Sequence, residues 1–189
     1  MKDNPNNVKR VSPAMDGTAG GRRSESLLRA PTVSHVLGEV VWIAAKSGTY
    51  NSYTAAQLVS SFLPAIQCNQ FLIARQDTVP LGAIFWAFVD DPTDRSLEGL
   101  VRDNSPLNIS ERLWQSGENC WVIATLWMDG SDNQLLPVFI ADLIAGPLRG
   151  VRFKMVTTSE SGSRTVSIEP DAGDRLVHSL ETIVRAAGN

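Results

Sequence analysis

The chain has 189 residues, of which 43% are hydrophobic and 20% are charged, a composition typical of one globular domain. The formal net charge at pH 7 is −3, and an acidic protein of this kind is not expected to bind nucleic acid. No apolar run reaches the roughly 18–20 residues that a bilayer crossing requires, so no membrane span is predicted.

Residues 1–32 are rich in Asn, Pro, Gly, Ser and Arg and lack hydrophobic periodicity, which predicts a disordered polar leader before a single domain at residues 33–189. The leader carries six basic and three acidic residues, so the remainder of the chain has a net charge of −6. Residues 1–17 also lack the apolar stretch of a secretory signal. We therefore expect a cytoplasmic protein whose two cysteines, Cys68 and Cys120, are free thiols.

Two amphipathic helices are predicted after the leader. Residues 34–47 place apolar side chains at helical spacing, with Ser34 as the expected N-cap, and the pattern stops at a Ser-Gly pair. Residues 54–70 form the second, capped by Thr54 or Ser52. Between them lies a break of small and polar residues that also contains a tyrosine.

The rest of the chain alternates strands and helices. The predicted strands are residues 71–76, 81–89, 119–128, 151–159 and 164–170. The predicted helices are residues 93–103, 109–117, 133–148 and 171–188. Turn residues at 77–80 and 160–164 indicate two hairpins, and the apolar run at 119–128 indicates a central strand buried on both faces. This order predicts an α+β fold with a mixed, mainly antiparallel sheet flanked by helices.

The sequence contains no Gly-rich phosphate loop, no His/Cys cluster with metal-ligand spacing and no Gly-x-Ser-x-Gly elbow. Neither a metal nor a bound cofactor is predicted. His35 and His178 lie on separate predicted helices, where a lone histidine is more often a surface residue than a catalytic one.

The sequence has five tryptophans, which are Trp42, Trp86, Trp114, Trp121 and Trp127. Four of the five adjoin helix ends or strands around the predicted sheet. Core packing is the more common explanation of such a set, and an apolar groove for an acyl chain is the alternative that the sequence leaves open.

Three stretches in combination resemble the RTX-toxin-activating lysine acyltransferases. They are LGEVVWIAAKSGTYNSY, FLPAIQCNQFLIARQDTVP and LWQSGENCWVIA, with a tryptophan strand between the last two. The positions shared with the family are Leu37, Gly38, Val40, Trp42, Ser47, Leu63, Pro64, Ala65, Ile66, Asn69, Gln70, Pro80, Trp86, Ser116, Gly117, Trp121 and Ile123. The resemblance covers roughly residues 33–170 and is weaker in the last third.

The resemblance implies a GNAT-like fold and a cytoplasmic enzyme that moves a fatty acyl group from acyl carrier protein to a lysine of a protein or peptide. An RTX-type protoxin is one candidate acceptor, and a homodimer is one expected assembly. Candidate catalytic residues are Tyr50 and Ser47. Candidate substrate-binding residues are Trp42, Asn69, Gln70, Trp86, Trp121 and Ala124.

Two positions depart from the family pattern. The family's catalytic histidine falls on Tyr50, and its catalytic aspartate falls on Ala124. A lysine with a pKa of about 10.4 is less than about one part in a thousand neutral at pH 7, so its acylation needs a base. A phenol with a pKa of about 10 is a poor base at that pH, and alanine is none.

Three interpretations follow from these substitutions. In the first, Tyr50 is a general acid that protonates the departing thiolate, while Ser47 polarises the thioester carbonyl. In the second, the protein is an inactive relative that binds an acyl chain, acyl carrier protein or another partner. In the third, Glu39, His35 or Asp129 supplies the base. Because acyl carrier proteins are acidic, binding one also calls for a local basic patch, for which the candidates are Arg75, Arg149, Arg152 and Lys154.

Overall fold

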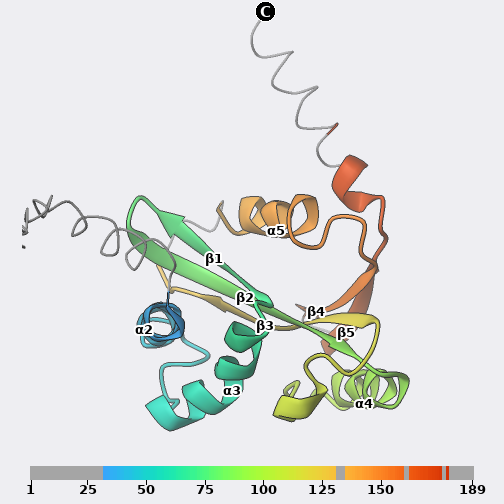
Figure 1. Cartoon of the computed structure of the whole chain (residues 1–189), viewed down its shortest axis with the longest axis horizontal. Helices are drawn as coiled ribbons and strands as arrows, with labels where there is room; N and C mark the ends of the chain where they lie inside the picture. The colour runs from blue at the N-terminus through green and yellow to red at the C-terminus, as the bar shows by residue number, and fades with distance from the viewer. Residues whose placement is uncertain (1–31, 131–134, 160–161, 176–177, 179–189) are drawn as a thin grey trace, which may run out of the picture. The chain divides into compact units, whose positions relative to one another are not determined.

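The computed structural model describes residues 32–130, 135–159, 162–175 and 178 (Figure 1). The predicted leader and most of the predicted C-terminal helix lie outside these residues. The elements in chain order are α2 (Val33–Ala44), α3 (Ala55–Gln67), β1 (Phe71–Gln76), β2 (Val79–Val89), α4 (Asp91–Arg102), the 3₁₀ turn η1 (Glu111–Leu113), β3 (Asn119–Trp127), α5 (Leu135–Ala145), β4 (Phe153–Ser159) and β5 (Gly162–Ile168).

The two N-terminal helices begin at side-chain caps. Thr32 has an extended backbone and its hydroxyl accepts a hydrogen bond from the backbone N–H of His35 at 3.2 Å, so the predicted cap at Ser34 was wrong by two residues. The prediction of Thr54 as the cap of α3 is confirmed. Thr54 and Gln57 form a reciprocal capping box, in which each side chain accepts from the other's backbone N–H.

The five strands form one sheet in the order β1-β2-β3-β4-β5. Both predicted hairpins, β1–β2 and β4–β5, are antiparallel, as is the β2–β3 pair. The first hairpin turn is shorter than predicted: only Asp77 and Thr78 lie between the paired residues Gln76 and Val79. Asp77 has φ of 55°, which suits the tight turns that match the twist of a hairpin.

The pairing of β3 with β4 is the irregular part of the sheet. These strands are parallel, and only two residue pairs join them, Cys120 with Phe153 and Trp121 with Lys154. The remainder of β3 has no strand partner on that side within the described residues. The sheet therefore splays apart between β3 and β4, leaving space beside the second half of β3.

Helices cover both faces of the sheet (Figure 1). On one face, α2, α3 and α4 pack over the inward side chains of β2 and β3, with Phe85 and Trp121 fully buried among them. On the other face, α5 packs over Ile84 and Val122 through Leu143. The predicted α+β architecture, with β3 buried on both faces, is confirmed.

Two segments after β2 differ from the predictions. The helix α4 begins at Asp91, two residues earlier than expected, and is capped by Asp90; Pro92 fits the first turn of a helix. The predicted helix at 109–117 is a single 3₁₀ turn. Beyond it the chain runs beside β2, where Phe88 donates its backbone N–H to the Trp114 carbonyl and forms a parallel bridge with Gln115.

A glycine in β2 makes room for a tryptophan in β3. A Cβ at Gly82 would lie 2.2 Å from Cε3 of Trp127, the cross-strand partner of Gly82. We expect Gly82→Ala to lower the free energy of unfolding by about 1–3 kcal/mol, because the indole ring must shift in a packed layer. The midpoint and slope of urea unfolding measure this change.

Gly38→Ala is the matched control for this prediction. Gly38 lies within α2, and a Cβ added there meets nothing within 4 Å. The same glycine-to-alanine change should therefore raise stability by about 0.5–1 kcal/mol through helix propensity. Equal effects at the two positions would contradict the packing explanation for Gly82.

Candidate functional site

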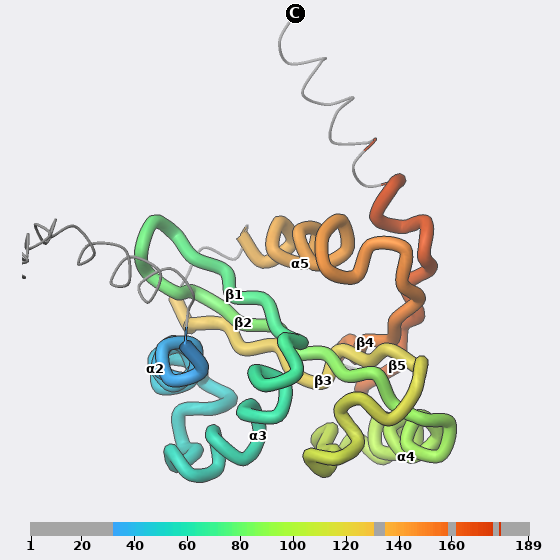
Figure 2. Tube along the Cα trace, in the orientation of Figure 1, coloured from blue at the N-terminus to red at the C-terminus, as the bar shows by residue number. Residues whose placement is uncertain are grey.

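Tyr50 lies in the break between α2 and α3. Figure 2 shows the loop that joins these two helices. The carbonyl of Ser47 accepts hydrogen bonds from the backbone N–H groups of Tyr50 at 3.1 Å and Asn51 at 2.9 Å, and the Tyr50 carbonyl accepts from Tyr53. These consecutive turns fix the position of the Tyr50 backbone. Ser47 is buried and contributes through its backbone carbonyl, whereas its side chain does not line the cavity that contains Tyr50.

Gly48 allows the end of β3 to approach this break. A Cβ at Gly48 would lie 2.8 Å from the carboxylate Oδ2 of Asp129, and the backbone N–H of Asp129 donates to the carbonyl of Lys46 at 2.9 Å. The turn that carries Tyr50 is therefore tied to the residues directly after β3.

The Tyr50 ring packs edge-on against two other aromatic rings. Its centroid lies 5.2 Å from that of Tyr53 and 5.9 Å from that of Phe62, and Phe62 in turn stacks on Phe85 of β2 at 4.5 Å. Edge-to-face contacts at these distances are favourable for aromatic pairs. The chain of rings holds the phenol against the sheet, while its hydroxyl has no hydrogen-bond partner among the described residues.

A β-bulge in β3 brings Ala124 to the same place. Phe85 pairs with Ala124 while the next residue, Trp86, pairs with Val122, so Ile123 is the extra residue. Both Ile123 and Ala124 then face the side of the sheet that α3 covers, where they line a cavity together with Tyr50. Bulges commonly redirect side chains beside functional sites.

The cavity shared by Tyr50 and Ala124 has a volume of about 540 Å³. Its walls come from the break, α3, the loop after α4, Trp114 directly after η1, and β3. The lining residues are Thr49, Tyr50, Tyr53, Gln57, Ser60, Ser61, Phe62, Pro106, Leu107, Asn108, Ile109, Trp114, Ile123 and Ala124. None of these side chains carries a charge at neutral pH, and the cavity presents hydroxyl and amide groups as well as apolar side chains.

A second cavity of about 310 Å³ adjoins the first at the splay between β3 and β4. Pro106, Leu107 and Ile123 line both. Val156 of β4 and Val101 of α4 contribute to the second cavity only. An elongated ligand lying along β3 would therefore pass Leu107 and Ile123.

The pKa of the Tyr50 phenol is raised above its ordinary value of 10.0 by burial and, to a smaller extent, by neighbouring Tyr53. Tyr50 therefore keeps its proton throughout the neutral range. It can donate a hydrogen bond or a proton to a ligand in the cavity, and it cannot act as the resting base.

The other predicted binding residues do not line this cavity. Trp42 is half-exposed on α2, with the ammonium of Lys46 4.2 Å from its ring centroid. Trp86 is buried on the opposite face of the sheet with α5. Trp121 is buried under α4, where its indole N–H donates to Asp94 at 2.6 Å.

Asn69 and Gln70 connect the end of α3 to the sheet. Asn69 has a left-handed backbone with φ of 55°, and the Gln70 carbonyl accepts from the backbone N–H of Trp86 at 3.1 Å. The buried side-chain carbonyl oxygen of Gln70 has no partner in the described part of the chain. These two residues hold α3 against β2, and through α3 they position Phe62 and the cavity wall.

The three residues considered as replacement bases lie elsewhere. Glu39 accepts two hydrogen bonds from Arg75, at 2.8 and 2.6 Å, and the exposed His35 approaches it from the preceding helical turn. Asp129 stands beside Gly48 and does not line the cavity.

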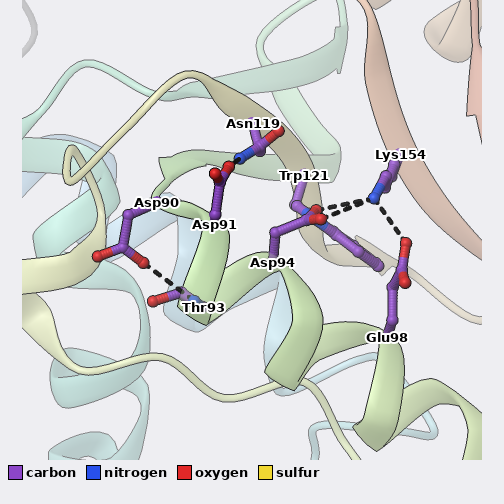
Figure 3. Close-up of polar contacts among 8 residues, drawn as sticks. All are labelled: Asp90, Asp91, Thr93, Asp94, Glu98, Asn119, Trp121 and Lys154. Carbon is purple, nitrogen blue, oxygen red and sulfur yellow. Dashed lines mark hydrogen bonds and ion pairs between the residues drawn. The ribbon is translucent and has the colours of Figure 1, made fainter.

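The four candidate members of a basic patch are all ion-paired. Arg75 pairs with Glu39, Arg149 with Asp174 and Arg152 with Glu169. Lys154 lies between Asp94 and Glu98 of α4, at 2.8 and 2.6 Å, beside the Trp121 indole (Figure 3). These side chains stabilise contacts between elements and do not form a patch of uncompensated positive charge.

Neither cysteine is suited to nucleophilic chemistry at this site. Burial raises the pKa of the Cys120 thiol to about 12, and Cys120 lies with α5 on the face opposite Tyr50. Burial also raises the pKa of Cys68, with a smaller contribution from Glu111. Among the described residues, no grouping of His, Cys, Asp or Glu could hold a metal ion, and no helix has both the length and the apolarity to cross a bilayer.

Comparison with known proteins identifies the family. A model of the RTX toxin acyltransferase family (HlyC) matches residues 29–169, and the chain belongs to that family. It is 29% identical over 101 residues to the protein-lysine myristoyltransferase HlyC of Escherichia coli, covering 53% of this chain and 56% of that protein. It is likewise 29% identical over 89 residues to the RTX-II toxin-activating lysine-acyltransferase ApxIIC of Actinobacillus pleuropneumoniae, covering 47% of this chain and 52% of that protein.

The matched segment thus spans about half the length of these characterised relatives. An uncharacterized protein of Synechocystis is 30% identical over 103 residues, which are 53% of this chain and 67% of that protein. Among solved structures, the loading GNATL domain of CurA from Lyngbya majuscula is similar with a TM-score of 0.45 and 19% identity, over 70% of this chain and 65% of that one.

Proposed function

We propose that this protein transfers a fatty acyl group from a thioester on acyl carrier protein to an amino group of a protein or peptide, in the cytoplasm. The observation that carries the proposal is the cavity that Tyr50 and Ala124 share in a member of the RTX toxin acyltransferase family. A relative of this chain is named as a toxin-activating lysine-acyltransferase. An RTX-type protoxin is therefore a candidate acceptor.

The splay between β3 and β4 offers a binding place for the acyl donor, which is the loaded acyl carrier protein. Beyond Trp121 the β4-facing edge of β3 has no strand partner among the described residues, so its backbone N–H and C=O groups are available to an extended ligand. The amide-containing arm of a carrier protein can pair with this edge. Its acyl chain then extends into apolar space beside Leu107 and Ile123.

Tyr50 supplies a proton at the reacting thioester. The neutral amine attacks the thioester carbonyl carbon and the carbon–sulfur bond breaks. The attacking nitrogen releases the proton that restores the donor, and the departing sulfur takes up one proton. A phenol that stays protonated and has no competing hydrogen-bond partner can donate it. Neither a metal nor a bound cofactor takes part in this proposal.

The same cavity also supports a second candidate function, which is binding without acyl transfer. The cavity is uncharged and the basic candidates for carrier binding are ion-paired, which fits a protein that binds an acyl chain or a partner without turnover. In that case the Tyr50 hydroxyl holds a ligand carbonyl and no acyl group is transferred.

The experiment is a transfer assay with myristoyl-loaded acyl carrier protein. The acceptor is a peptide that carries one free α-amino group and one lysine, and intact mass reports the added acyl group. We expect catalysed transfer above the rate without protein, together with release of unloaded carrier. Tight binding of the loaded carrier with no acyl transfer to this peptide or to hydroxylamine would favour the binding protein instead.

A further inference from the structure

We infer that Asp94 of α4 is a positioning residue for the acyl donor, because its carboxylate joins β3 to β4 at the point where these two strands part. The inference rests on the proposed function, in which the donor lies along the splay and its acyl chain enters the cavities beside it. Asp94 acts without touching the donor, through the three elements that form walls of the second cavity.

The carboxylate of Asp94 binds one residue from each strand. Its Oδ1 accepts hydrogen bonds from the indole Nε1 of Trp121 in β3 at 2.6 Å and from the ammonium of Lys154 in β4 at 2.8 Å (Figure 3). Its Oδ2 accepts from the same ammonium at 3.0 Å. Trp121 and Lys154 are also the final residue pair of the parallel β3–β4 ladder within the described residues. We call Asp94, Trp121 and Lys154 the strand junction.

The strand junction is partly shielded from water. Trp121 is fully buried, and the side chains of Asp94 and Lys154 are 16% and 23% exposed. Burial alone would lower the pKa of Lys154, but its hydrogen bonds to Asp94 and Glu98 outweigh burial and raise the pKa above its ordinary value of 10.5. The ammonium therefore stays charged in the neutral range. Charge-assisted hydrogen bonds are stronger than neutral ones, and salt screens them less when they are partly buried.

Each element that meets at the strand junction also supplies a wall of the second cavity. In α4, Val101 lies seven residues after the junction aspartate, which is about two helical turns and hence the same side of the helix. In β4, Val156 lies two residues after the junction lysine and so shares its face of the strand. In β3, Ile123 lies two residues after the junction tryptophan and packs with it under the helices. A shift at the junction therefore changes the shape of this cavity.

Side-chain contacts must hold the strands at their distance beyond the junction. Past Trp121 no ladder hydrogen bond joins β3 to β4 in the described part of the chain. A second contact across the opening joins the loop after α4 to β5, where the Ser163 hydroxyl donates to the Asn104 side chain at 2.7 Å. That contact is neutral and exposed, so the charged junction should be the stronger of the two.

Another residue of α4 separates the junction from ordinary stabilisation of the helix. Asp91 and Asp94 both lie in the first turn of α4, where a negative charge is favourable for a helix. Asp91 accepts a hydrogen bond from the Asn119 side chain at 2.9 Å, at the start of β3. Both carboxylates thus link α4 to β3, and Asp94 additionally binds β4. Asp91→Asn is therefore a matched control for Asp94→Asn.

The test compares two acyl chains on one carrier protein. The whole 189-residue chain and its variants receive acyl carrier protein loaded with either a myristoyl or an octanoyl group, together with a saturating lysine peptide. Initial rates give kcat and KM for each donor. Because the carrier is the same, the ratio of kcat/KM for the two chains reports the cavity and not the carrier surface. Urea unfolding verifies that each variant is folded under the assay conditions.

We expect the myristoyl-to-octanoyl ratio to fall by at least about tenfold in Asp94→Asn, since a misplacement of about 1 Å far from the chemistry can cost about 10²-fold. The change should appear in KM for the myristoyl donor. At saturation kcat should stay within about threefold, because the Tyr50 ring contacts are untouched. Asp94→Glu, which keeps the carboxylate, should recover part of the ratio. Asp91→Asn should change the ratio by less than about twofold.

Lys154→Met tests the same junction if Asp94→Asn does not fold. It removes the ammonium and keeps an unbranched side chain near the Trp121 ring, whose centroid lies 5.4 Å from Nζ of Lys154. The same fall in the ratio is expected. An unchanged ratio in either folded junction variant, or an equal fall in Asp91→Asn, would overturn the inference.

Direct binding separates this inference from the proposed function. Calorimetric titration with the two loaded carriers, without an acceptor, gives a Kd for each acyl chain. If the original protein binds a loaded carrier but transfers no acyl group, the acyltransferase function fails, and the ratio of the two Kd values tests the junction in place of kcat/KM. If it neither binds nor uses either donor, the inference fails together with the proposed function.

Discussion

Replacing Tyr50 by phenylalanine should lower the catalysed rate of acyl transfer by about 10²–10⁴-fold, the usual contribution of a positioned acid or base. The substitution removes the hydroxyl and keeps the ring contacts with Tyr53 and Phe62. Because the hydroxyl has no partner among the described residues, its removal should change the free energy of unfolding by less than about 0.5 kcal/mol. Initial rates with loaded acyl carrier protein and urea unfolding measure the two effects.

Tyr53→Phe is the matched control for this experiment. Tyr53 lines the same cavity, but its side chain is 39% exposed and stands at the outer end of the row of rings. Loss of its hydroxyl should leave the rate within about threefold of the original, a change below about 1 kcal/mol. If both variants lost activity equally, or Tyr50→Phe kept full activity, Tyr50 would not be the proton donor.

Local sequence patterns were sufficient for most of the fold. The apolar spacing of Val36, Val40 and Ile43 predicted α2, and alternation in the last two strands predicted their hairpin. The errors in the predicted element boundaries lie where two neighbouring side chains could cap the same helix, or where a segment is shaped by its contact with the sheet. Thr32 competes with Ser34 for the same cap, and the segment before Trp114 tightens to a 3₁₀ turn because it must reach β2.

The candidate site was predictable at two of its positions. Resemblance to the family singled out Tyr50 and Ala124, which lie 74 positions apart in the sequence and on one cavity in the structure. Thr49 and Asn108 were not predicted, and Trp114 was named only as one of five tryptophans that could line an acyl groove. The places of Asn108 and Trp114 depend on how the loop after α4 returns to the sheet. No periodic signal in the sequence specifies that return.

Trp42 and Trp86 show the opposite case, in which a predicted site residue lies away from the cavity. Trp86 is adjacent to Phe85 in β2, and neighbouring strand residues point to opposite faces, so only one of the two can face α3. Trp42 directly precedes Ile43, whose side chain faces the core from α2, and is half-exposed. The family resemblance and the aromatic side chains had suggested both residues as substrate-binding.

The double substitution Tyr50→His with Ala124→Asp should raise the rate of lysine acylation at pH 7 by about 10²–10⁴-fold, because it adds a base to a cavity whose walls are uncharged. A histidine with a pKa near 6.5 is mostly neutral at pH 7 and can accept the ammonium proton, and a carboxylate at position 124 would favour the charged imidazolium. The gain should be larger for lysine than for an α-amine, since lysine depends more on a base. The ratio of ε- to α-acylation in the peptide that carries one free α-amino group and one lysine measures this shift.

Tyr50→His with Ala124→Asn is the matched control, since asparagine has nearly the shape of aspartate without its charge. It should recover only part of the gain, because the amide can orient the imidazole but cannot stabilise its positive charge. Burial of the new polar groups should cost both variants about 1–3 kcal/mol of stability, which urea unfolding can verify before rates are compared. If the folded Asp variant acylated lysine no faster than the original protein, the amine would not be deprotonated beside positions 50 and 124, and the cavity would have to be assigned to donor binding alone.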